Sequence, residues 1–262
     1  MKILHKLLIA FTSLTIAACG PSAGTSTGNG LAMSATSGTQ PLVASPPAAD
    51  LQGTEFSLST VRAYVRHVEF DLPSGTVCAD VEDAVDPTTL CNDSGSSGSS
   101  TITLEGPFVF DLLNKTSTPP LDTIQLPAAT YKRIDVRFDD ALVSDGLVTS
   151  TDPLADNTLV AAGDFTYNGT AHTFDLALKF NEDARFESVD GVTLEENLAA
   201  TILLNLDVDD WFSATPITQC IDDGDLTLTG THLLIEDSSG GCSGIENGIK
   251  EAIKLSGQLD KL

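Results

Sequence analysis

The sequence predicts an all-β protein, a β-sandwich that ends in one amphipathic helix. Apolar and polar residues alternate over most of residues 53–212, which is the period of a half-buried strand. The dipeptide Asn168-Gly169 lies between two alternating segments and is a strong hairpin signal. About eight strands follow one another at spacings typical of all-β domains, and no helical period precedes residue 240. Two facing sheets would then bury a common core.

The first part of this domain contains three predicted strand regions. Residues 56–72 alternate in two phases, which predicts one long strand with a bulge, or two strands. An acidic surface loop rich in Ser and Gly is expected over 78–100, and a short apolar strand over 106–113. Residues 131–138 (YKRIDVRF) alternate cleanly and predict a half-buried strand.

The second part contains the hairpin and the most apolar segment of the mature chain. The expected segments are a hairpin of 159–167 and 171–180, a short strand over 185–189 with Asp190-Gly191 as its turn, and a strand over 200–212 that carries Trp211. A polar, glycine-rich loop is expected over 213–244. These elements complete the predicted sandwich.

The C-terminal residues predict a helix over 244–259. Ser243 and Glu246 have the spacing of a capping box, and the apolar residues fall mostly on one helical face. They are Ile245, Ile249, Ala252, Ile253 and Leu259. We expect this helix to dock on the sandwich; binding of a partner or of a membrane is the alternative.

The first twenty residues predict export and lipid anchoring. Lys2 and Lys6 begin a segment whose apolar run, 7–18, is shorter than the about 20 residues that span a bilayer. Small residues then precede Cys19, as at a signal-peptide cleavage site. This resembles the lipobox of bacterial lipoproteins, in which Cys19 would be lipidated and anchor the mature chain to the membrane. Gly20 is not an aspartate retention signal, so the resemblance implies an outer-membrane lipoprotein of the cell envelope, facing the periplasm or the cell surface.

The segment after Cys19 is expected to be a disordered tether. It is rich in Ser, Thr, Gly, Ala and Pro and has no charge before Asp50. A flexible chain of this length spans roughly 30 Å, so the folded part would stand off the membrane. The predicted organisation is a signal peptide (1–18), a tether (19–52), a sandwich (53–212) and a disulfide-closed loop with the C-terminal helix (213–262).

The mature chain is strongly acidic. The whole chain has 13 basic and 37 acidic residues, and two of the lysines belong to the signal, so the mature charge is 11 − 37 = −26. Such a charge argues against nucleic acid as a partner and against adhesion to anionic lipid. Solubility, binding of a divalent cation and binding of a cationic partner remain as explanations.

Four cysteines remain after Cys19. An even number in an exported chain predicts disulfides, and three pairings are possible. We favour Cys78–Cys91 and Cys220–Cys242, because each pair brackets one loop rich in Asp, Ser and Gly. Each closed loop would stabilise the fold by about 3 kcal/mol. A zinc site is the competing interpretation, but these intervals lack the short spacing of structural zinc ligands.

The run FDLLNKTSTPPLDTIQLPAATYKRIDVRF (110–138) carries a family resemblance. It is similar to bacterial lipoproteins of the domain-of-unknown-function family 4382, in which an FDLL strand, an LPAGTY turn and an xRIxVxF strand follow in that order. Here Ala129 replaces the usual glycine of the turn. VRHVEFDL (65–72) and the lipobox also fit, and the likeness covers residues 53–210. The resemblance implies an immunoglobulin-like or transthyretin-like sandwich fold and an envelope location, and no activity.

Two surface features are candidate binding sites. Arg62, Arg66, Arg133 and Arg137 lie on the polar faces of two predicted strands and would form a cationic stripe with Tyr64 if the strands are neighbours. Such a stripe could dock an anionic glycan or an acidic partner, and cross-strand pairing with Glu69, Asp71 and Asp135 is the alternative. The acidic loop residues Asp222, Asp223 and Asp225 are the best candidates for Ca²⁺, which prefers oxygen ligands.

No catalytic motif was found in the sequence. The histidines of the mature chain, His67, His172 and His232, lie in different segments, and no G-x-S-x-G elbow occurs. We therefore expect a non-enzymatic binding or structural module with an unknown protein or glycan partner and no cofactor. The alternative is a Ca²⁺-dependent adhesion or carbohydrate-binding domain, and a hydrolase with a site assembled from distant residues is a third hypothesis.

Overall fold

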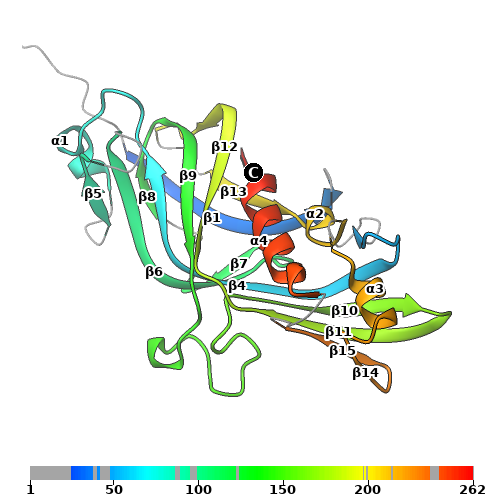
Figure 1. Ribbon diagram of the computed structural model, residues 1–262. Helices are drawn as coiled ribbons and strands as arrows, with labels where there is room; N and C mark the ends of the chain where they lie inside the picture. The colour runs from blue at the N-terminus through cyan, green and yellow to red at the C-terminus, as the bar shows by residue number, and fades with distance from the viewer. Residues whose placement is uncertain are drawn as a thin grey trace, which may run out of the picture.

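The chain folds into a large mixed β-sheet with four α-helices among the described residues. The computed structural model describes residues 25–37, 40–41, 48–85, 89–94, 99–121, 124–196, 198, 200–213, 215–236 and 242–261. The all-β class predicted from the alternation is confirmed at this level. The described strands join into one continuous, strongly bent sheet with two arms (Figure 1).

Strand β4 (Glu55–Asp71) runs through both arms of the sheet (Figure 1). The first arm continues from β4 through β10 (Leu159–Tyr167), β11 (Thr170–Leu178), β15 (His232–Ile235) and β14 (Leu228–Thr229). The second arm continues through β9 (Thr130–Phe138), β12 (Glu182–Thr193), β16 (Gln258–Lys261), β13 (Thr201–Asp207), β1 (Thr25–Ser37) and β2 (Gln40–Pro41).

Five further strands and the helices complete the described architecture. The remaining strands are β3 (Ala48–Ala49), β5 (Leu90–Asn92), β6 (Thr101–Asp111), β7 (Thr116–Thr118) and β8 (Ile124–Pro127). The helices are α1 (Cys78–Val81), α2 (Val208–Ser213), α3 (Ile217–Asp222) and α4 (Gly244–Ser256), with 3₁₀ turns η2 (Glu82–Ala84) and η3 (Val143–Asp145). None of the described helices is long and apolar enough to span a membrane.

The sheet forks at β4, which is one long strand with two bulges. One edge of β4 pairs with β6, while the other pairs first with β10 and then with β9. The register shifts at Ser59 and again at Arg66. A glycine faces each irregularity: a Cβ on Gly163 would lie 1.9 Å from the Ser57 carbonyl oxygen, and one on Gly106 2.4 Å from that of Arg66. The predicted bulged strand is therefore confirmed, and the partner glycines make its bulges sterically possible.

The main core lies between the two arms and beneath the helices. Phe56 stacks on Phe165 and on Phe212 of α2, with ring centroids 5.1 Å apart in both pairs. Helix α4 lies in the hollow of the bent sheet (Figure 1), and its buried residues belong to this core. They are Ile245, Ile249, Ala252 and Ile253. On its outer side, Lys254 of α4 lies 2.8 Å from a carboxylate oxygen of Glu182 in β12.

The prediction of a disordered tether over 19–52 is wrong for residues 25–37. Residues 25–37 form β1, which pairs in parallel with β13 and antiparallel with β8. Leu31 and Met33 of this strand are buried in the main core. The prediction was wrong because small residues dominate the composition of β1. Two large apolar side chains at alternate positions are nevertheless buried on one face of the strand. The expected boundary at residue 52 therefore does not separate tether from sheet.

The structure also corrects the C-terminal part. β13 ends at Asp207, and the segment expected to continue it turns into α2, where Trp211 is fully buried. The region 213–244, expected to be a loop, contains α3, β14 and β15, so the sheet crosses the expected boundary at residue 212. The helix expected over 244–259 is α4, followed by β16; Ser243 makes no side-chain cap bond, so the capping box is not formed.

The hairpin prediction is confirmed, and the neighbouring turn prediction is wrong. Tyr167 pairs with Thr170 across Asn168 and Gly169, which both have positive φ, as a type I′ turn requires. By contrast, Asp190-Gly191 does not end a short strand. It lies in a bulge within the twelve-residue strand β12, between Glu187 and Val192.

Both predicted disulfides are present. Cys78 is bonded to Cys91 and joins α1 to β5, and Cys220 is bonded to Cys242 and joins α3 to the start of α4. Cys220 and Cys242 are buried in the main core. Strands β14 and β15 lie between these two cysteines in the chain, so this disulfide encloses the free edge of the first arm.

Candidate binding site on the outer face of the sheet

The face of the sheet opposite the main core is the outer face, and the loop 139–158 divides it. This loop connects β9 to β10 and therefore starts and ends at the fork. On one side lies a groove over β4, β10, β11 and β15, which we call the groove half. On the other side lies a charged hollow over β4, β9 and β12, which we call the ion-paired half.

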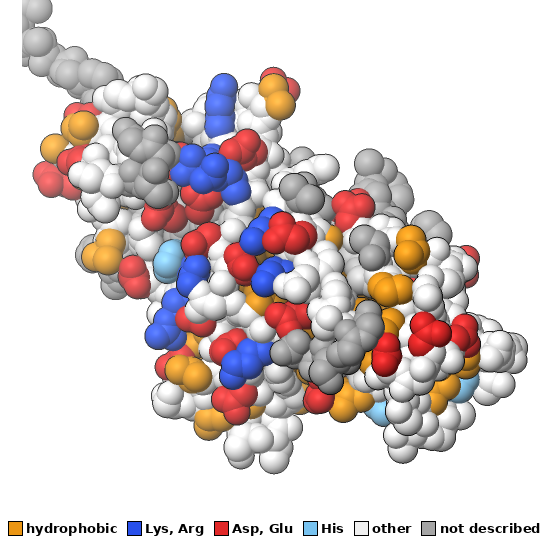
Figure 2. All heavy atoms as spheres, in the orientation of Figure 1, with side chains coloured by type: hydrophobic (Ala, Val, Ile, Leu, Met, Phe, Trp, Pro, Cys, Tyr) orange, Lys and Arg blue, Asp and Glu red, His pale blue; other side chains and the backbone are white. Residues whose placement is uncertain are grey.

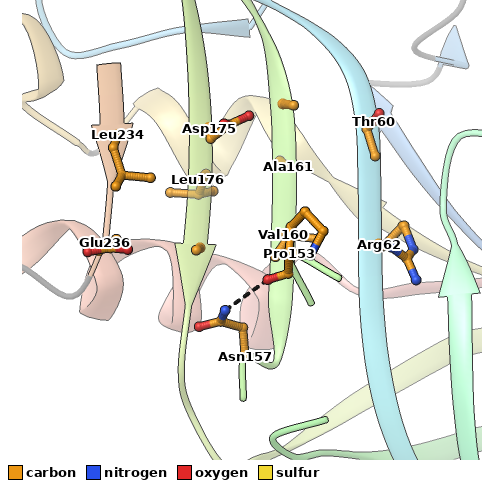
Figure 3. A pocket seen from close by; sticks show the side chains of 12 residues that line it. Thr60, Arg62, Pro153, Asn157, Val160, Ala161, Asp175, Leu176, Leu234 and Glu236 are labelled. Carbon is orange, nitrogen blue, oxygen red and sulfur yellow. Dashed lines mark hydrogen bonds between the residues drawn. The ribbon is translucent and has the colours of Figure 1, made fainter. Parts of the chain in front are cut away.

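The groove has a volume of about 350 Å³ and a floor of small side chains (Figure 3). Val160 and Ala162 of β10 and Ala177 of β11 form this floor, because alternate residues of neighbouring strands share one face. Leu234, whose surface is 46 % exposed, lies on β15, between β11 and the edge strand β14. An exposed leucine beside a floor of valine and alanine offers apolar surface to a ligand.

Polar groups mark the ends of the groove. Thr60 and Arg62 of β4 line one end (Figure 3). Asp175 of β11 and Glu236 after β15 lie on the opposite side, and both are exposed. The Asp175 carboxylate is 3.5 Å from Nε2 of His232. The groove thus joins an apolar floor to an acidic edge.

The loop 139–158 forms one wall of the groove and is held by Arg62. The guanidinium of Arg62 donates two hydrogen bonds to the Asp152 carboxylate, at 2.8 and 3.1 Å. Burial raises the pKa of Asp152, but hydrogen bonds from Arg62 and from the backbone N–H of Leu154 outweigh it, so the net pKa is lowered. Asn157 donates to the Pro153 carbonyl oxygen at 2.9 Å and fixes the rim of the wall (Figure 3).

Tyr64 anchors the same loop at the boundary between the two halves. Its ring is fully buried in a small second core with Val109, Val148 and Leu154. Its hydroxyl donates to the carboxylate of Asp145, which also accepts a 3.0 Å hydrogen bond from Arg66. Burial and then the hydrogen bond to Asp145 raise the pKa of Tyr64 to about 12. Tyr64 therefore stabilises the loop instead of offering a surface for a partner.

The ion-paired half is a hollow of about 560 Å³ in which opposite charges alternate (Figure 2). Arg133 contacts Asp71 at 3.3 Å and Asp135 at 2.8 Å, with side chains that are less than one-fifth exposed. Arg185 of β12 contacts the other oxygen of Asp135 at 3.0 Å. Hydrogen bonding to Asp135 is the main reason that the pKa of Arg185 is raised. The hollow is a network of neutralised charges.

The predicted cationic stripe is only partly right. β4 and β9 are neighbours, as the prediction required. However, each of the four arginines has a carboxylate partner: Arg62 has Asp152, Arg66 has Asp145, Arg133 has Asp71 and Asp135, and Arg137 has Asp183. The cross-strand pairing expected as the alternative is confirmed for Asp71, whereas Arg133 and Asp135 pair within the same strand, β9. Tyr64 is buried and does not lie on a cationic surface.

The three predicted calcium ligands are not brought together. Asp222 accepts a hydrogen bond from Tyr167, Asp223 is the C-cap residue of α3, and Asp225 contacts Cys242. Among the described residues, the carboxylates that meet in a group of three are those of Glu69, Asp71 and Asp135. Arg133 and Arg185 already contact two of these three carboxylates. The geometry there is that of an ion-pair network.

Among the groove residues named above, Arg62 was a predicted site residue, and the apolar residues of the groove were not predicted. The signal that could have found them is the outward row of β10 and β11, where Ala162 and Ala177 take positions that are polar elsewhere on the outer face. Leu234 could not be assigned to any face, because residues 213–244 were expected to be a loop. Cys19, the predicted lipidation site, lies outside the described residues.

Comparisons with known proteins leave the identity of the chain open. No protein-family model, no curated protein and no solved structure matches this sequence or fold. The resemblance to the domain-of-unknown-function family 4382 therefore stays a prediction.

Proposed function

We propose that this protein is a non-enzymatic binding module of the bacterial cell envelope, anchored by lipid at Cys19 and resembling the domain-of-unknown-function family 4382. The lipobox and the two disulfides support an oxidising location outside the cytoplasm, and Gly20 supports the outer membrane. On this proposal the two arms of the bent sheet correspond to the two layers of an immunoglobulin-like or transthyretin-like sandwich.

The groove is the observation that carries the binding function. Its floor of Val160, Ala162 and Ala177 suits a small apolar side chain, and the exposed carboxylates of Asp175 and Glu236 suit a neighbouring cation. The net charge of −26 in the mature chain adds long-range attraction for a basic partner. We therefore propose that the ligand is a protein segment with an apolar residue next to lysine or arginine.

A defined peptide array tests this ligand class. Immobilised hexapeptides that combine each apolar residue with each charged residue would be probed with the purified protein. We expect enrichment of Leu or Val beside Lys or Arg, and loss of this binding in Ala177→Trp, which fills the groove. Glu187→Gln, an exposed residue of the ion-paired half, is the matched control. Binding without a charge preference, or binding that survives Ala177→Trp, would contradict the proposal.

The anchor requires a separate test. Mass spectrometry of protein from its native cells should find a chain that begins at an acylated Cys19, and Cys19→Ser should lose membrane association. A chain that retains Met1, or a Cys19→Ser variant that stays on the membrane, would rule out the lipid anchor without affecting the groove.

A further inference from the structure

The short distance in sequence between Cys19 and β1 fixes which end of the fold can approach a membrane. This inference rests on the proposed lipid anchor. β1 begins at Thr25, six residues after Cys19 (25 − 19 = 6). Six residues span at most about 20 Å even when fully extended. The lipid at Cys19 would therefore keep the start of β1 within about 20 Å of the bilayer, closer than the roughly 30 Å that a long tether would allow.

Strand pairing shows which other parts share this end. Thr25 pairs with Pro127 at the end of β8, and the chain then turns into β9. The beginning of β9, at Thr130, pairs with Thr193 at the end of β12. Because β4 is antiparallel to β9, the end of β4 and the loop with α1 and β5 also lie here. Figure 1 shows the start of β1, α1, β5 and the ends of β8, β9 and β12 gathered at one end of the molecule, the anchor end.

Exposed apolar side chains gather on the loops of the anchor end. Of the large apolar side chains that are exposed among the described residues, four lie there. They are Val77 (44 % exposed), Leu90 (57 %), Val189 (92 %) and Leu198 (54 %). Val189 stands on the bulge of β12, with Gly191 in a positive-φ conformation beside it. The transfer of side chains of this kind out of water is favourable.

The charge at this end selects the kind of lipid surface. Exposed acidic residues surround the apolar side chains, and Lys132 is the exposed cation at the beginning of β9. These acids are Asp80, Glu82, Asp83, Asp93, Asp190, Glu195 and Glu196. Carboxylates resist burial in hydrocarbon and are repelled by anionic headgroups. We propose that the anchor end rests on a zwitterionic lipid surface, with Val189 and its neighbours in the headgroup region and the loop 139–158 directed away from the membrane.

Depth-dependent quenching tests this orientation. The full lipidated protein, carrying either Val189→Trp or Leu142→Trp, would be reconstituted into phosphatidylcholine vesicles that contain brominated lipid. Leu142 is 42 % exposed and lies on the loop 139–158, at the bottom of Figure 1, which makes it the matched control. The native Trp211 is buried and supplies a constant background.

We expect the added tryptophan at 189 to be quenched by at least one-third, and that at 142 to be unchanged. Equal quenching at both positions, or no quenching in protein that floats with the vesicles, would overturn the orientation while leaving the anchor intact. Protein that does not float would instead overturn the anchor, so the two failures are distinguishable. Adding anionic lipid should reduce the quenching at 189, and an increase would contradict the choice of lipid surface.

Discussion

The groove half and the ion-paired half share strand β4 and the same sheet, yet their outward residues differ. In the groove half the outward row holds Val160, Ala162 and Ala177, and the one arginine, Arg62, is used to fix a loop. In the ion-paired half, Arg133 of β9 pairs with Asp71 of β4, and Arg185 of β12 pairs with Asp135 of β9. Charges that are already paired gain little free energy from binding a ligand. Apolar surface that is exposed to water gains free energy when a ligand covers it. The difference separates a surface that stabilises the fold from one that can bind.

The largest effect should come from the disulfide that encloses the edge of the groove half. Replacing Cys220 and Cys242 by alanine should lower the free energy of unfolding by about 3 kcal/mol, because the unfolded chain gains loop entropy. Amide exchange in β15 should accelerate more than in β12, since β15 lies inside the closed loop. Guanidinium unfolding and hydrogen exchange measure these changes. The Cys78→Ala, Cys91→Ala variant is the control, and the same acceleration of β15 there would contradict the assignment.

In the ion-paired half, Arg133 should matter more than Arg137. Arg133→Ala removes the cation that contacts both Asp71 and Asp135. Asp135 keeps its contact to Arg185, so the loss falls mainly on Asp71 and should cost about 2 kcal/mol. Arg137→Ala removes a contact to Asp183, whose side chain is 68 % exposed, and should cost less than about 1 kcal/mol. Denaturant titrations of the two variants would measure both losses of unfolding free energy. Equal losses would show that the network does not act as a unit.

The raised pKa of Tyr64, at the boundary between the two halves, predicts that the free energy of unfolding falls at alkaline pH. Its pKa is about 12 in the fold and about 10 in the unfolded chain, so the unfolded state loses the proton first. Stability should therefore be complete below pH 10 and fall as the pH rises toward 12, by about 1.4 kcal/mol per pH unit from this group. Tyr64→Phe should remove this contribution to the fall of the free energy of unfolding with pH. Denaturant titrations at pH 10.5 and 11.5 measure that fall, and the same fall in the variant as in the parent would contradict the role of Tyr64.

The smallest effect concerns Asp152 in the wall of the groove. Its pKa is lowered in the fold, so its contribution is present above the usual carboxyl pKa and is lost as the pH falls through the lower, folded value. Between pH 6 and pH 3 the parent should lose up to about 1 kcal/mol more stability than Asp152→Asn. Amides of the loop 139–158 should exchange faster at pH 3 in the parent. Asp183→Asn, with an exposed carboxylate, is the control and should leave the loop unaffected.

Sequence reasoning worked where one local signal decided the structure. The dipeptide Asn168-Gly169 fixed its hairpin, and the bracketing of two loops by cysteines gave both disulfides. The bulged strand β4 was visible because a phase change in alternation needs no partner to be recognised. These features depend on residues close together in the chain.

The misses depended on partners far away in the chain. β1 looks like a linker until β13, more than 160 residues later, supplies the hydrogen bonds and the core for Leu31 and Met33. The apolar composition around Trp211 predicted a strand. Trp211 lies instead on helix α2, where it is fully buried. The groove escaped prediction for a related reason, since its residues come from β4, β10, β11 and β15 and have no common motif.

The position of β16 has a consequence for how this chain acquires its structure. Residues 258–261 lie between β12 and β13 and pair with both strands, while β1 flanks β13 on the other side. During synthesis β1 emerges first, and the four residues that link the two central strands emerge after both of them. The second arm can therefore close only after residues 258–261 have left the ribosome, and contacts between strands so distant in the chain form slowly.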